Sequence, residues 1–310
     1  QIEEKVKLVD QYKVNYVGIE LFLDGFAVED TTGDPGQFGE AVAAVRRASQ
    51  RPIVLISPNP KTIQAGLQKL NNEIPLIVGA NAHNWEAMAD LAKGAKAALT
   101  VAGSTLDELA DLVEKIKAKG VEDLVLNPEA PNLSTWLTLS TQIRRLAVKK
   151  NTKSLGFPVI AFPADSSEAA QAITKYAGFV VLNEFTPALA YALLVLRQNI
   201  YTDPQKPIQV QPGIYEINNP KPDSPVLVTT NFSITYFSVA NEVEASGLPA
   251  WLVVCDAEGM SVLTAWAAGK FDAERIAKSI KGFKVADKVS RQRLIIPGHV
   301  AVLSGELEAE

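Results

Sequence analysis

The sequence has few of the residues that build disulfides and metal sites. Its 310 residues include one cysteine, Cys255, and two histidines, His83 and His299. A single cysteine excludes a disulfide within the chain and cannot supply the set of thiolates that holds an iron–sulfur cluster. No second histidine or cysteine follows His83 at the spacing of a zinc site. We therefore interpret Cys255 as a buried core thiol and His83 as a loop or packing residue.

Positive charge and long apolar runs are also scarce. The chain carries 30 Lys and Arg against 35 Asp and Glu, a net charge of −5, which gives no basic surface for nucleic acid. Its longest apolar stretches, such as residues 188–196, are much shorter than the roughly 20 residues of a membrane span. We expect no nucleic-acid or membrane partner and a cytoplasmic location. The sequence begins with Gln1 and shows no secretory signal, so we interpret it as a fragment.

Several motifs of nucleotide sites are missing. No G-x-G-x-x-G follows the first expected strand, and no G-x-x-x-x-G-K-[ST] occurs, which argues against dinucleotide and nucleotide-hydrolysing sites. The sequence D-x-H-x-x-G is absent as well. The function must therefore be sought in the arrangement of strands and loops.

From residue 15 to about 185, short apolar runs alternate with longer amphipathic segments, a pattern typical of parallel strands and covering helices. The expected strands are Tyr16–Leu23, Pro52–Ser57, Pro75–Ala80, Ala97–Ala102, Asp123–Asn127, Pro158–Phe162 and Phe179–Asn183. The expected helices are Phe38–Ala48, Thr62–Leu70, Trp85–Ala92, Leu106–Lys119, Leu133–Lys150 and Ser167–Ala177.

These seven units fall one short of a closed eight-stranded TIM-type barrel. The amphipathic segment Ile2–Tyr12 has no strand before it, so we expect the missing strand to precede residue 1. An open doubly wound sheet is the alternative. The pattern predicts a TIM-type (β/α)8 barrel over residues 1–205.

A cluster of prolines marks the expected end of this barrel. Between residues 203 and 225 lie Pro204, Pro207, Pro212, Pro220, Pro222 and Pro225, and this composition cannot extend a helix or a central strand. We predict a linker over 206–224 and a truncated Rossmann-like or flavodoxin-like α/β domain over 225–310. Its expected strands and helices are Val226–Val228, Ile234–Ala245, Trp251–Cys255, Met260–Ala268, Ala273–Lys281, Leu294–Ile296 and Ala301–Glu308.

The loops that follow strands of the second domain are the candidate site, because ligands of α/β folds gather at the carboxyl ends of strands. These loops are 229–233, 256–260 and 297–299. Their hydroxyl, amide and glycine residues can approach a large ligand and hydrogen-bond its amide groups without a strong acid or base. The alternative is that residues 229–233 only cap a helix and that Asp256 and Gly259 form an ordinary turn.

Polar residues also follow the barrel strands. They are Glu20, Asp24, Asn81, Asn127, Glu129, Asp165 and Glu184. No spacing among them singles out an acid–base pair or a nucleophile with its base, so we interpret the barrel as a scaffold or docking surface.

Four longer segments carry a family resemblance that covers almost the whole chain. They are residues 141–150 (TQIRRLAVKK), 196–204 (LRQNIYTDP), 224–233 (SPVLVTTNFS) and 294–298 (LIIPG). They resemble the large subunit of the corrinoid iron–sulfur protein of the acetyl-CoA (carbon monoxide dehydrogenase/acetyl-CoA synthase) pathway. The resemblance implies an N-terminal module with a 4Fe-4S cluster, a TIM barrel and a C-terminal corrinoid domain. The cluster's cysteines are absent from this chain, and the family pattern extends past Glu310 by a strand and a loop.

The resemblance implies a corrinoid, bound with its nucleotide base detached, as the cofactor. The residues that it implies around the corrinoid are Thr229, Thr230, Asn231, Ser233, Tyr236, Asp256, Ala257, Glu258, Gly259, Met260, Pro297, Gly298, His299, Ala301, Leu303, Ser304 and Gly305. Ala257 departs from the threonine that the family often has at this position. No catalytic side chain and no protein ligand to the metal is expected.

The function that the resemblance implies is that of a methyl carrier in the reductive acetyl-CoA pathway. Cobalt would cycle between Co(I) and methyl-Co(III), taking the methyl group from a methylated tetrahydropterin. The implied partners are a small subunit that forms a heterodimer, a methyltetrahydropterin methyltransferase, acetyl-CoA synthase/carbon monoxide dehydrogenase and a reductive activator. A pterin-dependent methyltransferase barrel with a regulatory domain and a docking protein without a cofactor are the alternatives.

Overall fold

The structure is a computed structural model that describes residues 2–71, 73–201, 208–291 and 293–310. Contacts between Cα atoms divide the chain into two units. Unit 1 is Gln1–Val14 with Leu21–Ile200, and unit 2 is Asn15–Glu20 with Tyr201–Glu310. The predicted end of the barrel at 205 and the start of the linker at 206 lie outside the described residues, so both stay predictions. No helix among the described residues is long and apolar enough to cross a membrane.

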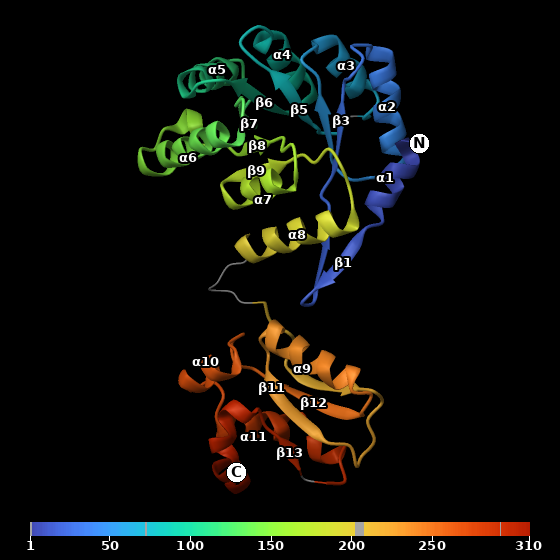
Figure 1. The fold of residues 1–310 in the computed structure, drawn as a ribbon, viewed down its shortest axis with the longest axis vertical. Coiled ribbons are helices and arrows are strands. Elements are labelled where there is room, and N and C mark those ends of the chain that lie inside the picture. The colour runs from blue at the N-terminus through green and yellow to red at the C-terminus, as the bar shows by residue number, and fades with distance from the viewer. Residues whose placement is uncertain (1, 72, 202–207, 292) are drawn as a thin grey trace. The chain divides into compact units, whose positions relative to one another are not determined.

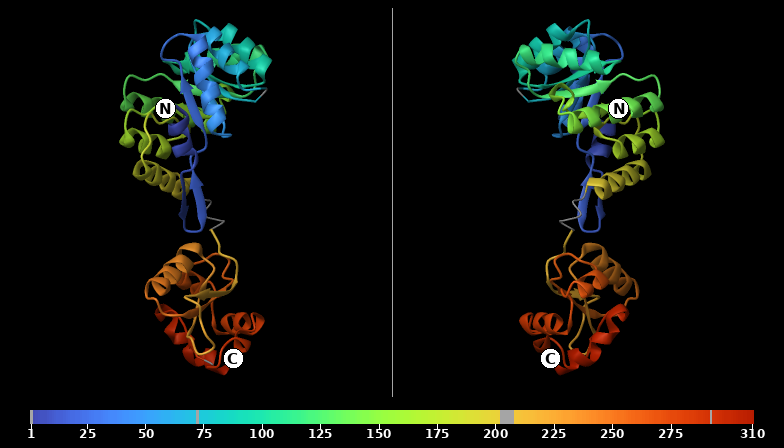
Figure 2. Two further views of the ribbon diagram at one scale, coloured as in Figure 1. Left: turned by 90° about the vertical axis from the view of Figure 1, so that its right-hand side faces the viewer. Right: turned by 90° about the vertical axis from the view of Figure 1, so that its left-hand side faces the viewer.

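Unit 1 is built on a seven-stranded parallel sheet, in which each strand pairs with the next one along the chain (Figure 1). Its strands are β3 (Phe26–Glu29), β4 (Ile53–Ile56), β5 (Leu76–Ala80), β6 (Ala98–Gly103), β7 (Leu124–Pro128), β8 (Val159–Ala161) and β9 (Ala177–Val180). Figures 1 and 2 show the helices on the outer side of the curled sheet. They are α1 (Ile2–Asp10), α2 (Pro35–Ala48), α3 (Pro60–Gln68), α4 (Trp85–Ala95), α5 (Leu106–Ala118), α6 (Leu133–Lys149), the 3-10 turn η1 (Lys153–Leu155), α7 (Ser166–Thr174) and α8 (Pro187–Tyr201).

The sequential strand order decides between the two predicted architectures. A doubly wound sheet reverses its strand order at a switch point, whereas a TIM-type sheet adds each strand beside the last. The order β3-β4-β5-β6-β7-β8-β9 has no reversal. The predicted fold class is therefore confirmed, and the open doubly wound alternative is wrong. The strand expected before residue 1 stays a prediction.

Helix α5 illustrates why these segments fold as they do. Thr105 caps its first turn by accepting a hydrogen bond from the backbone of Glu108 at 3.2 Å. Four apolar residues at three- and four-residue spacing, Leu109, Leu112, Val113 and Ile116, are buried. Full burial of such a side chain stabilises the fold by about 1.5–3 kcal/mol relative to exposure.

The first predicted strand, Tyr16–Leu23, is wrong. These residues belong to a two-stranded hairpin of β1 (Lys13–Tyr16) and β2 (Ile19–Phe22), and β3 begins only at Phe26. Val17 and Gly18 have φ of 45° and 85°, and the backbone of Gly18 donates to the side chain of Asn15 at 3.0 Å. The turn lies in a mostly apolar stretch, residues 16–23, so the pattern of apolar residues did not reveal it.

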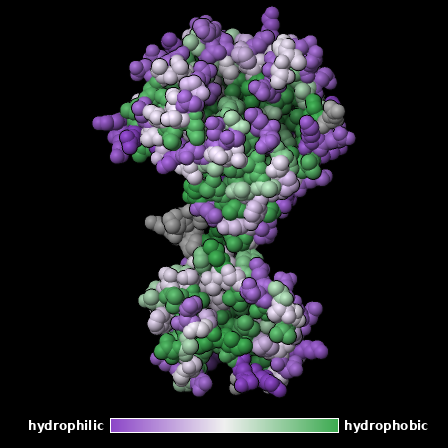
Figure 3. Space-filling model, viewed as in Figure 1, coloured by the Kyte–Doolittle hydropathy of each residue, from purple (hydrophilic) through white to green (hydrophobic). Residues whose placement is uncertain are grey.

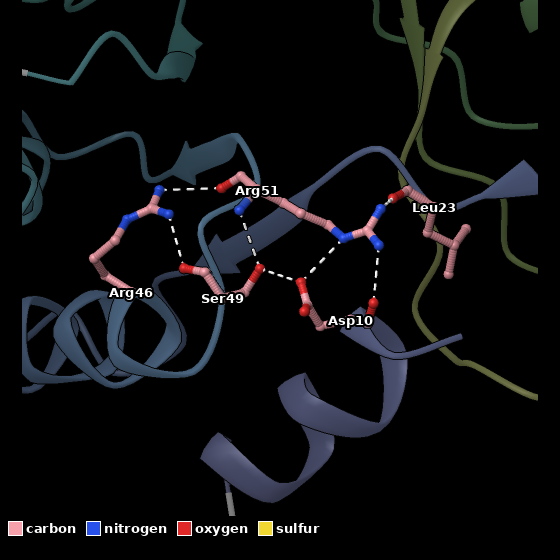
Figure 4. Close-up of polar contacts among 5 residues, drawn as sticks. All are labelled: Asp10, Leu23, Arg46, Ser49 and Arg51. Carbon is pink, nitrogen blue, oxygen red and sulfur yellow. Dashed lines mark hydrogen bonds and ion pairs between the residues drawn. The ribbon is translucent and has the colours of Figure 1, made fainter. Parts of the chain in front are cut away.

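A polar network joins the end of α1 to the loop before β4 (Figure 4). The Asp10 carboxylate accepts hydrogen bonds from the Ser49 hydroxyl and, at 3.0 Å, from Arg51 Nε. Arg51 also donates to the carbonyls of Asp10 and Leu23. Arg46 donates to the carbonyls of Ser49 at 2.8 Å and Arg51 at 3.1 Å. The network satisfies carbonyls at the end of α2 and fixes the entry to β4.

Unit 2 has a four-stranded mixed sheet in the order β10-β12-β11-β13. Its elements are β10 (Gly213–Ile217), β11 (Val226–Thr230), α9 (Ser233–Ala245), β12 (Ala250–Cys255), α10 (Val262–Ala267), α11 (Ala273–Gly282), the turn η2 (Val285–Asp287), β13 (Leu294–Ile295), the turn η3 (Gly298–Leu303) and α12 (Ser304–Ala309). Alternate residues of β11 and β12 enter separate apolar cores on the two faces of the sheet. The predicted α/β domain is thus confirmed as an architecture.

Residues 213–217, which the sequence places in the linker, form β10. This strand pairs antiparallel with β12, and Ile217 lies opposite Ala250. The neighbouring prolines are compatible with β10 because it lies at the edge of the sheet and needs hydrogen bonds on one side only. The predicted linker is corrected here, since this part of it belongs to the sheet.

Candidate functional site

The three candidate loops leave the same edge of the unit 2 sheet. β11 lies between β12 and β13 and runs parallel to both. Thr230 at the end of β11 is opposite Cys255 at the end of β12, and Leu227 is opposite Ile295 of β13. Parallel neighbours end at one edge, so the loops that follow them are adjacent.

Asn231 connects the first loop to the second. Its side-chain oxygen accepts hydrogen bonds from the backbone nitrogens of Ala257 at 2.9 Å and Gly259 at 3.0 Å. Its side-chain nitrogen donates to Asp256 at 3.1 Å and to Gln209 at 3.2 Å. The Asn231 side chain is fully buried, and all of these contacts are with protein groups. Asn231 therefore fixes the loops and has little capacity left for a ligand.

The second loop turns sharply after Asp256. Glu258 and Gly259 have φ of 55° and 73°, a left-handed conformation that costs a residue with a Cβ atom free energy. Glu258 is held by the backbone contact of its nitrogen with Asp256 at 3.0 Å and by an ion pair with Lys270 at 2.6 Å. The loop is thus an ordinary turn in local terms, as the alternative interpretation expected, and it is also fixed against Asn231.

The third loop is brought to the other two by packing. Val300 and Leu303 of η3 are buried in the same core as Val262 and Ala265 of α10, the helix that follows the second loop. Gly298 and His299 are exposed, and a Cβ atom at Gly298 would meet nothing within 4 Å. The third loop therefore presents open backbone at this edge.

Burial divides the predicted site residues into two groups. The buried ones, which form the framework of the edge, are Thr229, Thr230, Asn231, Ser233, Ala257, Gly259 and Leu303. The exposed ones are Asp256, Glu258, Gly298, His299, Ala301, Ser304 and Gly305, and Tyr236, Met260 and Pro297 are half-buried. Tyr236 packs beside Tyr215, with ring centroids 5.0 Å apart, in the core on the α9 face. Leu303 packs in the core on the opposite face.

Two buried hydroxyls of β11 bear on whether a ligand fits this edge. Thr229 and Thr230 are fully buried, and neither hydroxyl has a hydrogen-bond partner within the described part of the chain. A buried hydroxyl without a partner costs about 1–3 kcal/mol. The unpaired hydroxyls at the end of β11 and the open space at Gly298 are compatible with a ligand that is large and rich in amide groups.

The segment that borders the first loop was not predicted from the sequence. Gln209 forms an isolated bridge with Phe232, Val210 donates from its backbone to the Asn231 carbonyl at 2.9 Å, and Ser233 donates to the Ile208 carbonyl at 3.0 Å. The only sequence signal was a β-branched residue on each side of Gln209. The neighbouring prolines outweighed it.

The polar residues at the carboxyl edge of the unit 1 sheet are mostly engaged in local structure. Asp165 caps α7, Asn81 accepts a hydrogen bond from the backbone of exposed His83 at 2.9 Å, and Asp24 pairs with Arg197. Glu20 lies in the hairpin rather than in a barrel strand, so its predicted position is wrong. Asn127 and Glu129 line a cavity of about 470 Å³. Glu184 lines a smaller cavity of about 20 Å³.

Neither edge contains an obvious metal site. Among the residues that the structure describes, no group of three His, Cys, Asp or Glu side chains is placed to hold a metal ion. Cys255 is buried at the end of β12, where burial raises the pKa of its thiol to about 11. This thiol therefore stays protonated at neutral pH and packs in the core.

A family model and several known proteins match this chain over nearly its whole length. The family model described as CO dehydrogenase/acetyl-CoA synthase delta subunit matches residues 1–310. The corrinoid/iron-sulfur protein large subunit of Moorella thermoacetica is 43% identical over 99% of this chain and 70% of its own length. The acetyl-CoA decarbonylase/synthase complex subunit gamma of Archaeoglobus fulgidus is 33% identical over 100% of this chain and 70% of its own length.

Among solved structures, a dihydropteroate synthase of Coxiella burnetii aligns with a TM-score of 0.46 and 11% identity, over 65% of this chain and 85% of that one. A second dihydropteroate synthase, from Yersinia pestis, gives a TM-score of 0.44 and 12% identity, over 57% and 82%. The sequence relationships are far closer than these. The relatives of this chain include the corrinoid/iron-sulfur protein large subunit and the gamma subunits of acetyl-CoA decarbonylase/synthase complexes. The family match and these relatives show that this chain belongs to the CO dehydrogenase/acetyl-CoA synthase delta subunit family.

Proposed function

We propose that this chain binds a corrinoid at the carboxyl edge of the unit 2 sheet and acts as a methyl carrier of the acetyl-CoA pathway. The observation that carries the proposal is the joining of the first two loops by Asn231, beside the third loop on β13. Relatives named for a corrinoid/iron-sulfur protein and for acetyl-CoA decarbonylase/synthase complexes support it.

In this proposal the buried and exposed residues have separate tasks. Asn231 and Gly259 hold the edge in shape, so little conformational entropy is lost when a large ligand binds. Gly298 and Gly305 have exposed backbone where a Cβ atom would meet nothing within 4 Å, which lets a macrocycle approach closely. Exposed Ser304 and Asp256 would hydrogen-bond amide side arms.

The protein's own contribution is positioning and exclusion of competing ligands. When bound, the corrinoid supplies a cobalt nucleophile that accepts and passes on a methyl group. The thiol of Cys255 is buried. His299 is the one imidazole of unit 2, and it lies exposed in η3. We propose that it stays away from the metal and leaves the lower face open.

The proposal also includes partner proteins. We propose a small subunit as heterodimer partner, a methyltetrahydropterin methyltransferase as donor, acetyl-CoA synthase/carbon monoxide dehydrogenase as acceptor and a reductive activator. Unit 2 has exposed apolar side chains that a large ligand or a partner would cover, namely Ile234, Leu263, Trp266, Ile295 and Val302. Figure 3 shows hydrophobic surface on one face of unit 2. A 4Fe-4S cluster is proposed only for a longer parent protein.

Anaerobic reconstitution with hydroxocobalamin tests the proposal. The full chain should bind about one corrinoid, as measured by its visible absorbance after gel filtration. Gly298→Trp should weaken binding at least tenfold because the indole fills open space above the loop. Gly282→Trp is the matched control, since a Cβ atom there also meets nothing within 4 Å but the residue ends α11. Absence of saturable binding by the unsubstituted chain, or equal binding by both variants, would overturn the assignment.

A further inference from the structure

A cavity of about 470 Å³ lies in unit 1 beyond the carboxyl ends of β7 and β8, where TIM-type folds bind their ligands. Its volume is within the range of about 300–1,000 Å³ that is common for small-molecule sites. The residues that line it are Asn127, Pro128, Glu129, Ala130, Pro131, Trp136 and Phe162.

Asn127 and Glu129 differ from most polar residues at this edge. Asp30 accepts hydrogen bonds from the Ser57 hydroxyl at 2.9 Å and from the backbone of Gly33 at 2.7 Å. Asp165 and the other capping side chains likewise accept hydrogen bonds from groups of the chain itself. Within the described part of the chain, the side chains of Asn127 and Glu129 have no hydrogen bond or ion pair. Two polar side chains at the cavity are thus available for a ligand.

The backbone that carries Glu129 is fixed. Pro128 ends β7 opposite Gly103 of β6, and the backbone nitrogen of Glu129 donates to the Gly103 carbonyl at 3.0 Å. This bond extends the sheet by one residue past the strand. The exposed side chain of Glu129 therefore extends from a fixed backbone, which favours binding because little backbone freedom is lost.

Two aromatic side chains complete the wall. Trp136 lies in the first turn of α6, where Asn132 caps the helix, and it packs against the buried cluster of Ala161, Ala172 and Ala177. Phe162 follows β8 directly and is 41% exposed. An exposed phenylalanine beside a half-buried tryptophan leaves aromatic surface for a flat ligand to cover.

The charge of the lining decides the class of ligand. Glu129 is the one charged residue in it, and no lysine, arginine or histidine is present. Glu129 is exposed and Asn127 is half-buried. An anion would be repelled by the carboxylate, and an apolar ligand that covered these side chains would displace their water without replacing its hydrogen bonds. A cation is attracted both by the carboxylate and by aromatic faces. A planar guanidinium also pairs with a carboxylate through two parallel hydrogen bonds.

We propose that this cavity binds a small planar organic cation of the guanidinium or amidinium class. Glu129 accepts its paired N–H groups, the Asn127 amide oxygen accepts a further one, and Trp136 and Phe162 cover its faces. The inference goes beyond the corrinoid proposal, because the cavity lies within unit 1 and its test needs no corrinoid.

Calorimetric titration of the full chain tests this inference with three phenyl probes of similar shape. Phenylguanidinium should bind saturably, while the neutral phenylurea and the anionic benzoate should bind at least tenfold more weakly. Glu129→Gln should remove most of the preference for the cation. Phe162→Leu should weaken phenylguanidinium binding severalfold, and Phe162 is exposed enough for this change to leave the fold intact.

Glu184→Gln is the matched control, because it removes one carboxylate from the same edge but lines a cavity of about 20 Å³. It should bind phenylguanidinium as the unsubstituted chain does. Circular dichroism of each variant verifies folding. The inference is overturned if no probe binds saturably, if phenylurea binds as well as phenylguanidinium, or if the Glu129 and Glu184 variants lose binding equally.

Discussion

The side-chain oxygen of Asn231 lies 3.0 Å from the backbone nitrogen of Gly259, and this hydrogen bond joins the ends of two neighbouring parallel strands. Asn231 directly follows β11, and Gly259 lies in the turn after β12. One buried amide therefore maintains the edge at which the corrinoid is proposed to bind.

Replacing Asn231 should test its role as framework. Asn231→Ala leaves the backbone nitrogens of Ala257 and Gly259 without their acceptor, so we expect a loss of about 1–3 kcal/mol in the free energy of unfolding. Urea denaturation followed by circular dichroism measures it. Asn241→Ala, at an exposed position of α9, is a control with an expected change within about 0.5 kcal/mol. An equal loss in both variants would contradict the framework role.

The left-handed turn at Gly259 gives a second prediction. Gly259 has φ of 73°, so Gly259→Ala should destabilise the chain by about 1 kcal/mol. Gly298→Ala should be nearly neutral, because a Cβ atom at Gly298 meets nothing within 4 Å. Thermal denaturation of the two variants in parallel compares them. If Gly298→Ala destabilises the chain as much as Gly259→Ala does, the left-handed backbone conformation of Gly259 is not the cause of its destabilisation.

Cys255 should make stability depend on alkaline pH. Burial raises the pKa of its thiol to about 11, and a weaker hydrogen bond with Ser279 acts in the opposite direction. In the unfolded chain the pKa of a thiol is about 8.5. The protonated thiol of Cys255 therefore contributes fully to folding stability below that pH, and this contribution is lost as the pH rises towards 11. Its size is on the order of 3 kcal/mol.

The measurement is urea unfolding of the unsubstituted chain and of Cys255→Ala at pH 8 and pH 10.5. Tyrosines and lysines titrate in both proteins, so only the difference between them reports Cys255. That difference should shrink at the higher pH. Rapid alkylation of the native thiol by iodoacetamide at pH 8 would contradict its burial.

The hydrogen bonds around Asp10 should make the folding stability depend on pH in the acid range. The hydrogen bond from Ser49, and after it the contact with Arg51, lower the pKa of Asp10 against a partial desolvation that raises it. Because the pKa of Asp10 is lowered in the folded chain, ionised Asp10 contributes to folding stability above about pH 3.9. This contribution is lost as the pH falls through the pKa of Asp10 in the folded chain. Asp10→Asn should therefore be less stable than the unsubstituted chain at pH 7, and the difference should be smaller at pH 3.

Arg47→Ala is the control for this network. Arg47 pairs with Glu3 at 2.9 Å between exposed side chains, and such a pair contributes about 0–1 kcal/mol. Urea unfolding at the two pH values compares the variants. A larger effect at Arg47 than at Asp10 would refute the importance that we assign to the buried carbonyl contacts of Arg51.

His299 gives a spectroscopic prediction that rests on the proposed function. The cob(II)alamin form of the reconstituted protein should show no hyperfine splitting from a histidine nitrogen in electron paramagnetic resonance. His299→Ala should leave the spectrum unchanged, since the side chain is exposed in η3. Nitrogen splitting that disappears in this variant would show that His299 coordinates cobalt.

The alternation of apolar runs and amphipathic helices was enough to locate most strands of unit 1. Strands β4 to β8 fall within the predicted ranges or within a residue of them, because their burial pattern is local to each segment. The hairpin at Val17 and Gly18 was missed because no proline, asparagine–glycine pair or polar break marks that turn.

The candidate loops were found from strand ends alone, but their roles were not. The sequence treated Asn231, Gly259 and His299 alike, whereas the structure buries the first two and exposes the third. Burial depends on which strands are neighbours, and that information is not local. The same reason explains why β10 and the contact of Gln209 with Asn231 were not predicted.

From its residue pattern alone, the sequence predicts most helices and strands, the two architectures and most positions at which loops follow strands. These depend on residue spacing within a single helix or strand, which repeats every few residues. Tertiary structure alone decided that Asn231 joins two loops, that residues 213–217 enter the sheet, and that Glu129 faces a cavity with Trp136 and Phe162. Each of these depends on contacts between segments distant in sequence, which side-chain periodicity does not encode.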